Sequence, residues 1–132
     1  EIINSGIQPV QNLSVMKRII GIRKEYESFD DEQKVKYMFK WGRDIIHNGF
    51  IALEQLLSKL NNGKGFNYCI DDQNVTMADI CLVPQVYNAK RFGVDMTKFP
   101  NIQRINDNCM KLKAFQDAEP SKMIDAIPPS KL

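Results

Sequence analysis

The sequence predicts an all-α fold, a bundle of amphipathic helices that forms one domain. Apolar residues recur at spacings of three and four along most of the chain. The sequence shows neither the strict alternation typical of strands nor internal repeats. Capping signals precede several of these apolar runs. The 132 residues, 43% hydrophobic and 26% charged, suit one globular domain with a single core.

Composition excludes several classes of function. Lys and Arg number 18 against 16 Asp and Glu, and a formal charge of +2 gives no basic field for nucleic acid or an anionic membrane. No apolar run approaches the roughly 20 residues that span a bilayer. The three cysteines (Cys69, Cys81, Cys109) form no C-x-x-C pair and accompany one His, which argues against a disulfide framework or a zinc cluster and favours a reducing compartment.

The first helix is predicted from residue 3 to about Ile22. Gly6 and Pro9 lie inside it, and because proline lacks an amide donor and clashes with the preceding turn, we expect a kink at residues 5–9. The chain opens directly on helical spacing, without an initiator Met or a capping residue. This start favours a fragment that lacks an upstream segment.

A long second helix follows the acidic residues 25–32, where Ser28 or Asp30 can cap it. Gly42 and Gly49 lie on its apolar stripe. Each glycine costs about 1 kcal/mol of helix propensity relative to Ala, so we expect another backbone to pack closely there. The helix is therefore predicted to be central. Its expected stripe comprises Val35, Met38, Phe39, Gly42, Ile45, Ile46, Gly49, Leu53, Leu56, Leu57 and Leu60.

The second helix is expected to end in a turn at residues 61–65, followed by a loop at residues 66–74 whose apolar side chains cover the core. A third helix is predicted at residues 77–91. Thr76 and Asp79 have the spacing of a capping box. Pro84 lies in the interior of this helix, which favours a buried, well-packed position for it.

A fourth helix is predicted from the signal at residues 98–101, where Pro100 suits the first helical position. Apolar spacing carries this helix to Phe115. From Glu119 onward, the prolines predict an irregular tail.

One face of the first helix is unusual because residues 2–16 contain no charged side chain. Asn4, Gln8, Gln11 and Asn12 share this face, and Ser14 lies near it. Amides donate and accept hydrogen bonds without burying a full charge, so the face suits a polar ligand or a facing domain. The alternative is a surface that only packs against another element.

Arg91, near the end of the third predicted helix, could bind a carboxylate through two parallel hydrogen bonds. Its alternative role is a C-terminal cation that offsets the helix dipole. His47 has no partner for a triad or a metal, and Trp41 suits packing. The cysteines are expected to be core or loop thiols. No catalytic set and no metal site are predicted within these residues.

Three blocks, residues 5–15, 49–54 and 75–92, resemble zeta-class glutathione transferases, the maleylacetoacetate isomerase family. The run Gly-Ile-Gln-Pro-x-Gln-Asn-Leu-Ser is the more specific part, whereas Thr-Met-Ala-Asp indicates only the broad transferase superfamily. Asp95 and the segments 99–102 and 114–120 extend the similarity over nearly the whole chain.

The resemblance implies that residues 1–132 are the C-terminal helical domain of a two-domain subunit, a bundle of the glutathione transferase C-terminal type. The thioredoxin-like N-terminal domain, absent here, would hold glutathione and activate its thiol through a Ser-Ser-Cys motif. In this family the thiolate adds to the cis double bond of maleylacetoacetate, and rotation and elimination give fumarylacetoacetate, in phenylalanine and tyrosine breakdown.

By the same resemblance, Gln8, Asn12, Leu13 and Ser14 match positions near glutathione, and Arg91 matches an arginine that holds a substrate carboxylate. The implied parent is a cytoplasmic homodimer that uses glutathione as cofactor, with neither nucleic acid nor membrane as partner, and this chain alone is expected to be inactive. The alternative is a transferase-like helical module for binding or assembly.

Overall fold

The computed structural model describes residues 1–23, 26–60, 63–124 and 126, and over these residues the chain forms helices and loops without a strand. The predicted all-α class is confirmed. Glu25, Asn61, Asn62, Pro128 and Pro129, which entered the sequence predictions, lie outside this range. The helical elements are η1 (π-helix, Ile2–Ile7), α1 (Gln8–Gln11), α2 (Leu13–Ile22), α3 (Asp31–Lys59), α4 (Met77–Arg91), η4 (3₁₀, Met96–Lys98), α5 (Pro100–Cys109), α6 (Lys113–Asp117) and η5 (3₁₀, Pro120–Lys122).

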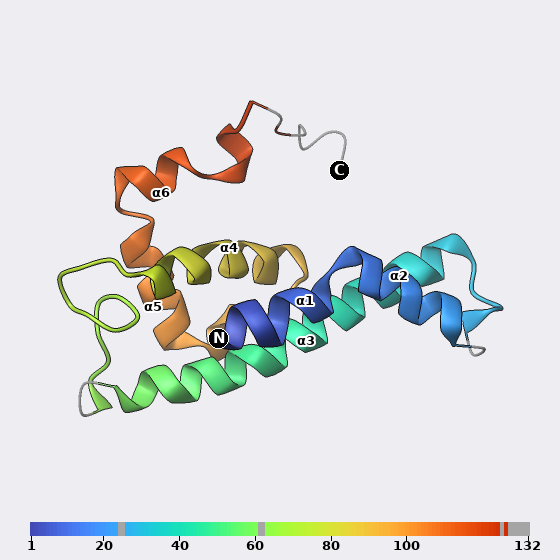
Figure 1. Cartoon of the computed structure of the whole chain (residues 1–132), viewed down its shortest axis with the longest axis horizontal. Helices are drawn as coiled ribbons and strands as arrows, with labels where there is room; N and C mark the ends of the chain where they lie inside the picture. The colour runs from blue at the N-terminus through green and yellow to red at the C-terminus, as the bar shows by residue number, and fades with distance from the viewer. Residues whose placement is uncertain (24–25, 61–62, 125, 127–132) are drawn as a thin grey trace.

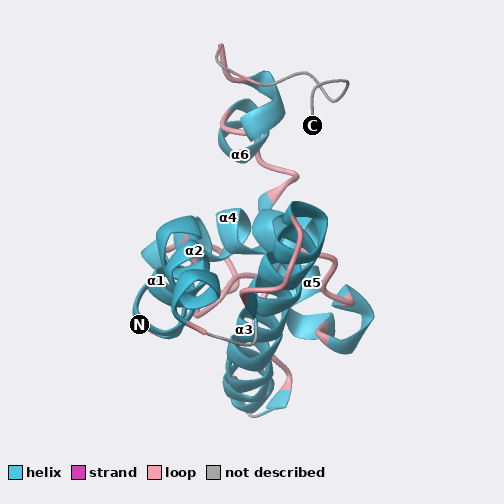
Figure 2. Ribbon diagram, turned by 90° about the vertical axis from the view of Figure 1, so that its right-hand side faces the viewer, coloured by secondary structure: helices cyan, strands magenta, loops and turns pink. Residues whose placement is uncertain are grey.

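The long helix α3 is central, as predicted. It contacts η1, α1, α2, α4 and α5, and Figure 1 shows it running the length of the molecule with the other helices along one side. Figure 2 looks nearly along α3 and shows the same grouping. The buried core comprises Ile3, Ile7, Ile46, Phe50, Leu57, Cys69, Leu82, Val86, Ala89, Val94, Phe99, Ile102, Ile105 and Cys109.

Asp30 caps α3, which confirms one of the two predicted caps and excludes Ser28. The Asp30 carboxylate accepts a hydrogen bond from the Gln33 amide at 2.8 Å, and the Gln33 side chain accepts one from the Asp30 amide at 3.0 Å. This reciprocal pair satisfies two amides that a helix start leaves without partners. Local sequence narrowed the cap of α3 to Ser28 or Asp30, and the structure selects Asp30.

The two glycines of α3 meet side chains rather than the expected second backbone. A Cβ at Gly42 would lie 2.5 Å from Cε1 of Phe92, and a Cβ at Gly49 would lie 2.3 Å from Cγ1 of Ile7. The expected close approach is therefore present, but the prediction of its nature was wrong. The missing methyl groups leave room for an aromatic ring and a branched aliphatic side chain.

The predicted first helix is divided into three pieces. Residues 2–7 form a π-helical turn and α1 begins at Gln8, so the irregularity expected at residues 5–9 is a change of helix type. The break in direction comes later, at Asn12, whose ψ of 139° is extended. Pro9 causes no break because it occupies the first turn of α1, where a missing amide proton is tolerated.

The predicted fourth helix was too long, because α5 ends at Cys109 and a separate helix, α6, begins at Lys113. Leu112 has an extended backbone, with φ −85° and ψ 132°. Figures 1 and 2 both show α6 standing apart from the other helices. Apolar spacing continued through residues 110–112, so periodicity alone did not reveal this turn.

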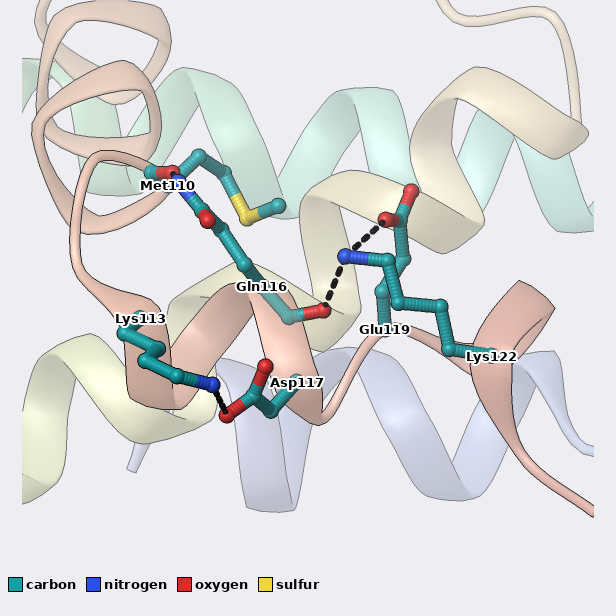
Figure 3. A network of polar contacts seen from close by, with 6 residues as sticks. All are labelled: Met110, Lys113, Gln116, Asp117, Glu119 and Lys122. Atoms are coloured by element: carbon teal, nitrogen blue, oxygen red, sulfur yellow. Dashed lines mark hydrogen bonds and ion pairs between the residues drawn. The ribbon is translucent and has the colours of Figure 1, made fainter.

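Polar contacts hold the segment around α6 together (Figure 3). The Gln116 side chain donates to the Met110 carbonyl oxygen at 2.9 Å, and Lys122 Nζ donates to the Gln116 carbonyl oxygen at 2.8 Å. Lys122 also forms an ion pair with Glu119 at 3.8 Å. These bonds are local and fix the path of the chain after α5, while Phe115 of α6 packs against the hydrophobic core.

The predicted third helix is confirmed as α4, and its capping box is present. The fully buried Asp79 carboxylate accepts hydrogen bonds from the Thr76 amide and the Thr76 hydroxyl, both at 2.8 Å. It also accepts one from the Cys69 amide at 2.7 Å. The loop at residues 66–74 is thereby tied to the beginning of α4.

Candidate functional site

The segment that carries the predicted glutathione contacts surrounds the break between α1 and α2. Asn12 is the N-cap of α2, and its side-chain oxygen accepts from the Ser14 amide at 2.9 Å and the Ser14 hydroxyl at 2.7 Å. Asn12, Leu13 and Ser14 are exposed, while Gln8 is half-buried. The N-cap role of Asn12 was missed, although Asn before an apolar run is a recognised start signal. The cap gives an exposed polar segment a fixed backbone.

For Gln11, the structure confirms the packing alternative for the amide face. Gln11 is buried, and its carboxamide is paired with that of Gln85 in α4. Gln11 Nε2 donates to Gln85 Oε1 at 3.2 Å, and Gln85 Nε2 donates to Gln11 Oε1 at 3.1 Å. The face is also interrupted at Asn4, whose side chain donates to the sulfur of Cys81 at 3.5 Å. Two of the four amides thus contact α4.

Arg91 is the last residue of α4, and its side chain is exposed. The helix ends there because Gly93 adopts a left-handed conformation, with φ 73°, and its amide donates to the Lys90 carbonyl oxygen at 3.1 Å. In the described part of the chain, no carboxylate forms an ion pair with Arg91 and no hydrogen bond joins it to residues 8–14. The guanidinium projects from a defined helix end.

The surface of α4 that ends at Arg91 is apolar. Met77, Ile80 and Tyr87 are exposed at spacings that place them on one helical face with Pro84. The opposite face buries Leu82, Gln85, Val86 and Ala89. Met77 has 73% of its surface exposed and Ile80 has 53%, values that are high for adjacent apolar side chains. We call Met77, Ile80, Pro84 and Tyr87 the α4 stripe.

A cavity of about 520 Å³ lies between the stripe side of α4 and the segment around α6. Most of its lining is apolar, with Lys90 and Glu119 as its charged members. The remaining lining residues are Ile80, Val83, Pro84, Val86, Tyr87, Asn88, Asn106, Met110, Phe115, Ala118 and Pro120. Arg91 is next to this lining in sequence and is not part of it.

The three cysteines are free thiols, two of them buried, as expected. Burial raises the pKa of Cys109 to about 11, with Asp79 adding to the effect. Burial and the Asp79 carboxylate also raise the pKa of Cys69 far above its ordinary value. A raised pKa keeps the thiol protonated and removes its nucleophilicity. Cys69 and Cys109 are therefore structural.

The other candidates also have packing roles. His47 is half-buried, with its ring 5.3 Å from that of Phe99, and Trp41 donates from Nε1 to the Val10 carbonyl oxygen at 3.2 Å. Among the described residues, no group of His, Cys, Asp and Glu side chains could hold a metal ion. No helix of the described residues is both long and apolar enough to cross a membrane.

Comparison with known proteins gives specific relatives. No protein-family model matches the chain. It is 44% identical over 128 residues to a maleylacetoacetate isomerase from Dictyostelium discoideum, covering 97% of this chain and 52% of that protein. The chain therefore spans about half the length of the curated relatives it matches.

Two solved structures share the fold. A maleylacetoacetate isomerase from Anaeromyxobacter dehalogenans, with dicarboxyethyl glutathione and citrate in its active site, aligns with a TM-score of 0.80 and 34% identity over 100% of this chain and 53% of that one. A maleyl pyruvate isomerase described as a zeta-class bacterial glutathione S-transferase aligns with a TM-score of 0.78 and 32% identity over 96% of this chain and 54% of that one. Over nearly its whole length, this chain is thus homologous to about half of a maleylacetoacetate isomerase and has the helical fold of zeta-class glutathione transferases.

Proposed function

We propose that this chain is the C-terminal substrate-recognition domain of a glutathione-dependent maleylacetoacetate cis-trans isomerase with glutathione transferase activity. The observation that carries the proposal is the helix α4, which combines an exposed apolar stripe with a guanidinium at its end. An isomerase domain of this kind needs a face for the thiol-activating domain and a cation beside the substrate. The Anaeromyxobacter dehalogenans isomerase holds both a glutathione derivative and a tricarboxylate.

Gln8, Asn12, Leu13 and Ser14 would contact glutathione. Their segment fits a peptide-like ligand, because its polar groups are amides, a hydroxyl and backbone groups, and residues 2–16 include no charged side chain. The Asn12 cap fixes the backbone of this segment before any ligand arrives, and preorganisation lowers the entropy that binding must overcome.

Arg91 would bind a carboxylate of the substrate. When bound, glutathione supplies the thiolate that adds to the cis double bond and leaves after rotation about the resulting single bond. Addition next to a carbonyl builds negative charge, and a guanidinium already in place stabilises that charge without reorganisation. Arg91 suits this role because it is exposed and is not engaged by a carboxylate of the described residues.

The α4 stripe would pack against a thioredoxin-like domain that carries the thiol-activating residues. Burying Met77, Ile80 and Tyr87 removes large apolar groups from water, which is favourable by roughly 25 cal/mol per Å². The resemblance implies a homodimeric parent enzyme, and the three free thiols are consistent with a cytoplasmic location. Isomerase activity of this chain alone would be negligible, because the thiol-activating groups belong to the other domain.

The test uses the full-length protein that contains this segment and follows glutathione-dependent isomerisation of maleylacetone over a range of substrate concentrations. Arg91→Ala is expected to lower kcat/KM, and the decrease should correspond to a loss of about 1–3 kcal/mol of transition-state stabilisation. Lys90→Ala is the matched control, since it removes a neighbouring exposed cation. An inactive wild-type protein would refute the proposed isomerase function and favour the non-catalytic assembly module. Equal effects of the two substitutions on kcat/KM would refute the role of Arg91.

A further inference from the structure

The Gln11–Gln85 pair joins the segment at residues 8–14 to helix α4 through two side-chain hydrogen bonds. Gln11 is 8% exposed and Gln85 is 0% exposed. Each carboxamide donates one hydrogen bond to the other and accepts one, at 3.2 and 3.1 Å. Neither side chain contacts solvent freely, so the pair is not available for a ligand.

Two reciprocal bonds between planar amides constrain geometry more strongly than an apolar contact does. An aliphatic pair at this position could slide or rotate while remaining packed, whereas the amide pair keeps both bonds only in one relative orientation. Loss of either amide would leave the other buried without a partner, which is unfavourable. The pair therefore fixes how α1 lies against α4.

Both amides are adjacent to groups of the proposed site. Gln11 is the last residue of α1, and the next residue is Asn12, where the backbone turns and caps α2. Gln85 lies less than two helical turns before Arg91 on α4. A second contact, from Asn4 to Cys81 at 3.5 Å, joins the same side of the domain to α4 one turn before Gln85.

We propose that Gln11 and Gln85 are positioning residues, which hold the glutathione-contacting segment in a fixed register with the helix that carries Arg91. This inference rests on the proposed function, and it concerns two residues that touch neither glutathione nor substrate. Their pairing sets the position of Asn12, Leu13 and Ser14 relative to α4. The expected consequence is a dependence of glutathione affinity on a buried bond outside the binding surface.

The test compares Gln11→Met, Gln85→Met and the double variant in the full-length protein. Methionine is unbranched and close to glutamine in size, so it keeps the packing while removing the amide. Urea unfolding reports stability, and steady-state kinetics report kcat and the KM for glutathione separately. Val86→Ala is the control, because it removes buried volume from α4 beside Gln85 and leaves the pair intact.

Each single variant is expected to lose stability and to raise the KM for glutathione about five- to tenfold, equivalent to about 1–1.4 kcal/mol. The double variant should regain much of the stability, because no amide is left unpaired, and should retain the raised KM. Val86→Ala should lose stability with an unchanged KM. If Gln85→Met does not fold, Gln11→Met at the slightly exposed end of the pair gives the same comparison.

A KM that returns to the wild-type value in the double variant would show that the pair only stabilises the fold, and an unchanged KM in all variants would overturn the inference in the same way. Both results would leave the isomerase proposal intact. A wild-type protein that neither binds glutathione nor isomerises maleylacetone would overturn the proposed function and this inference together.

Discussion

Substitution of Gly49 by alanine tests the packing between α3 and the first helical segment. The new Cβ would lie 2.3 Å from Cγ1 and 2.4 Å from Cδ1 of Ile7. Ile7 is fully buried, and its β-branched side chain has little rotamer freedom in a helix. The neighbour cannot swing into solvent, so the backbone must shift.

The expected magnitude follows from two opposing effects. Overpacking of a core costs about 1–3 kcal/mol, and replacing glycine by alanine inside a helix gains about 1 kcal/mol. Gly21→Ala in α2 has the same propensity gain and no atom within 4 Å of its Cβ. Gly21→Ala should therefore raise the free energy of unfolding by about 1 kcal/mol. The free energy of unfolding of Gly49→Ala should be about 1–3 kcal/mol lower than that of Gly21→Ala.

Equilibrium urea unfolding, followed by far-ultraviolet circular dichroism, measures both variants. Ile7→Ala provides a further check, since it removes Cγ1 and Cδ1 and leaves the Ile7 Cβ 3.8 Å from the new methyl group, an ordinary contact. In that background Gly49→Ala should become stabilising. If Gly49→Ala stabilises the unaltered protein as much as Gly21→Ala does, the packing argument is refuted.

Two further predictions concern a half-buried helix cap and the thiols. Glu54 accepts hydrogen bonds from the Asn101 and Ile102 amides at 2.8 and 3.0 Å, so Glu54→Gln should cost about 1–3 kcal/mol in urea unfolding, and a loss below about 0.5 kcal/mol would contradict this cap. The half-buried Cys81 should react with iodoacetamide before Cys109, as mass spectrometry of digests can show. Because burial raises the pKa of Cys109 to about 11, its thiolate becomes available, and its stabilising contribution falls, only as the pH rises from about 9 through 11. Rapid labelling of Cys109 at neutral pH in folded protein would contradict the burial argument.

Features whose causes are local were predicted well. The Thr76–Asp79 capping box begins α4 where the sequence placed it, because a cap and its partner are only three residues apart. Asp30 was one of two predicted caps of α3, and its partner Gln33 was not predicted. The central position of α3 was predicted from the two glycines on its apolar stripe and is confirmed, although these glycines meet side chains rather than a second backbone. Residue type and position suggested Arg91 as a carboxylate-binding group, and the resemblance added Gln8, Asn12, Leu13 and Ser14 as glutathione contacts. These roles remain predictions.

The missed features depend on distant partners or on turns without a signal. The role of Gln11 was left open between ligand binding and packing because its partner, Gln85, is 74 residues away in the sequence. The N-terminus of α5 is satisfied by Glu54 from α3, which no local pattern reveals. The turn after Cys109 contains neither proline nor glycine, so apolar spacing predicted a continuous helix there.

The shared carboxylate of Asp79 makes the preceding loop part of the helix that follows it. The Cys69 and Thr76 amides bond to the same side chain, so opening the first turn of α4 would release both of them. Slow hydrogen exchange at these two positions should then follow a single opening event, although one amide belongs to a loop. We therefore expect Cys69, in a loop, to be protected from exchange to the same degree as Thr76 at the start of α4.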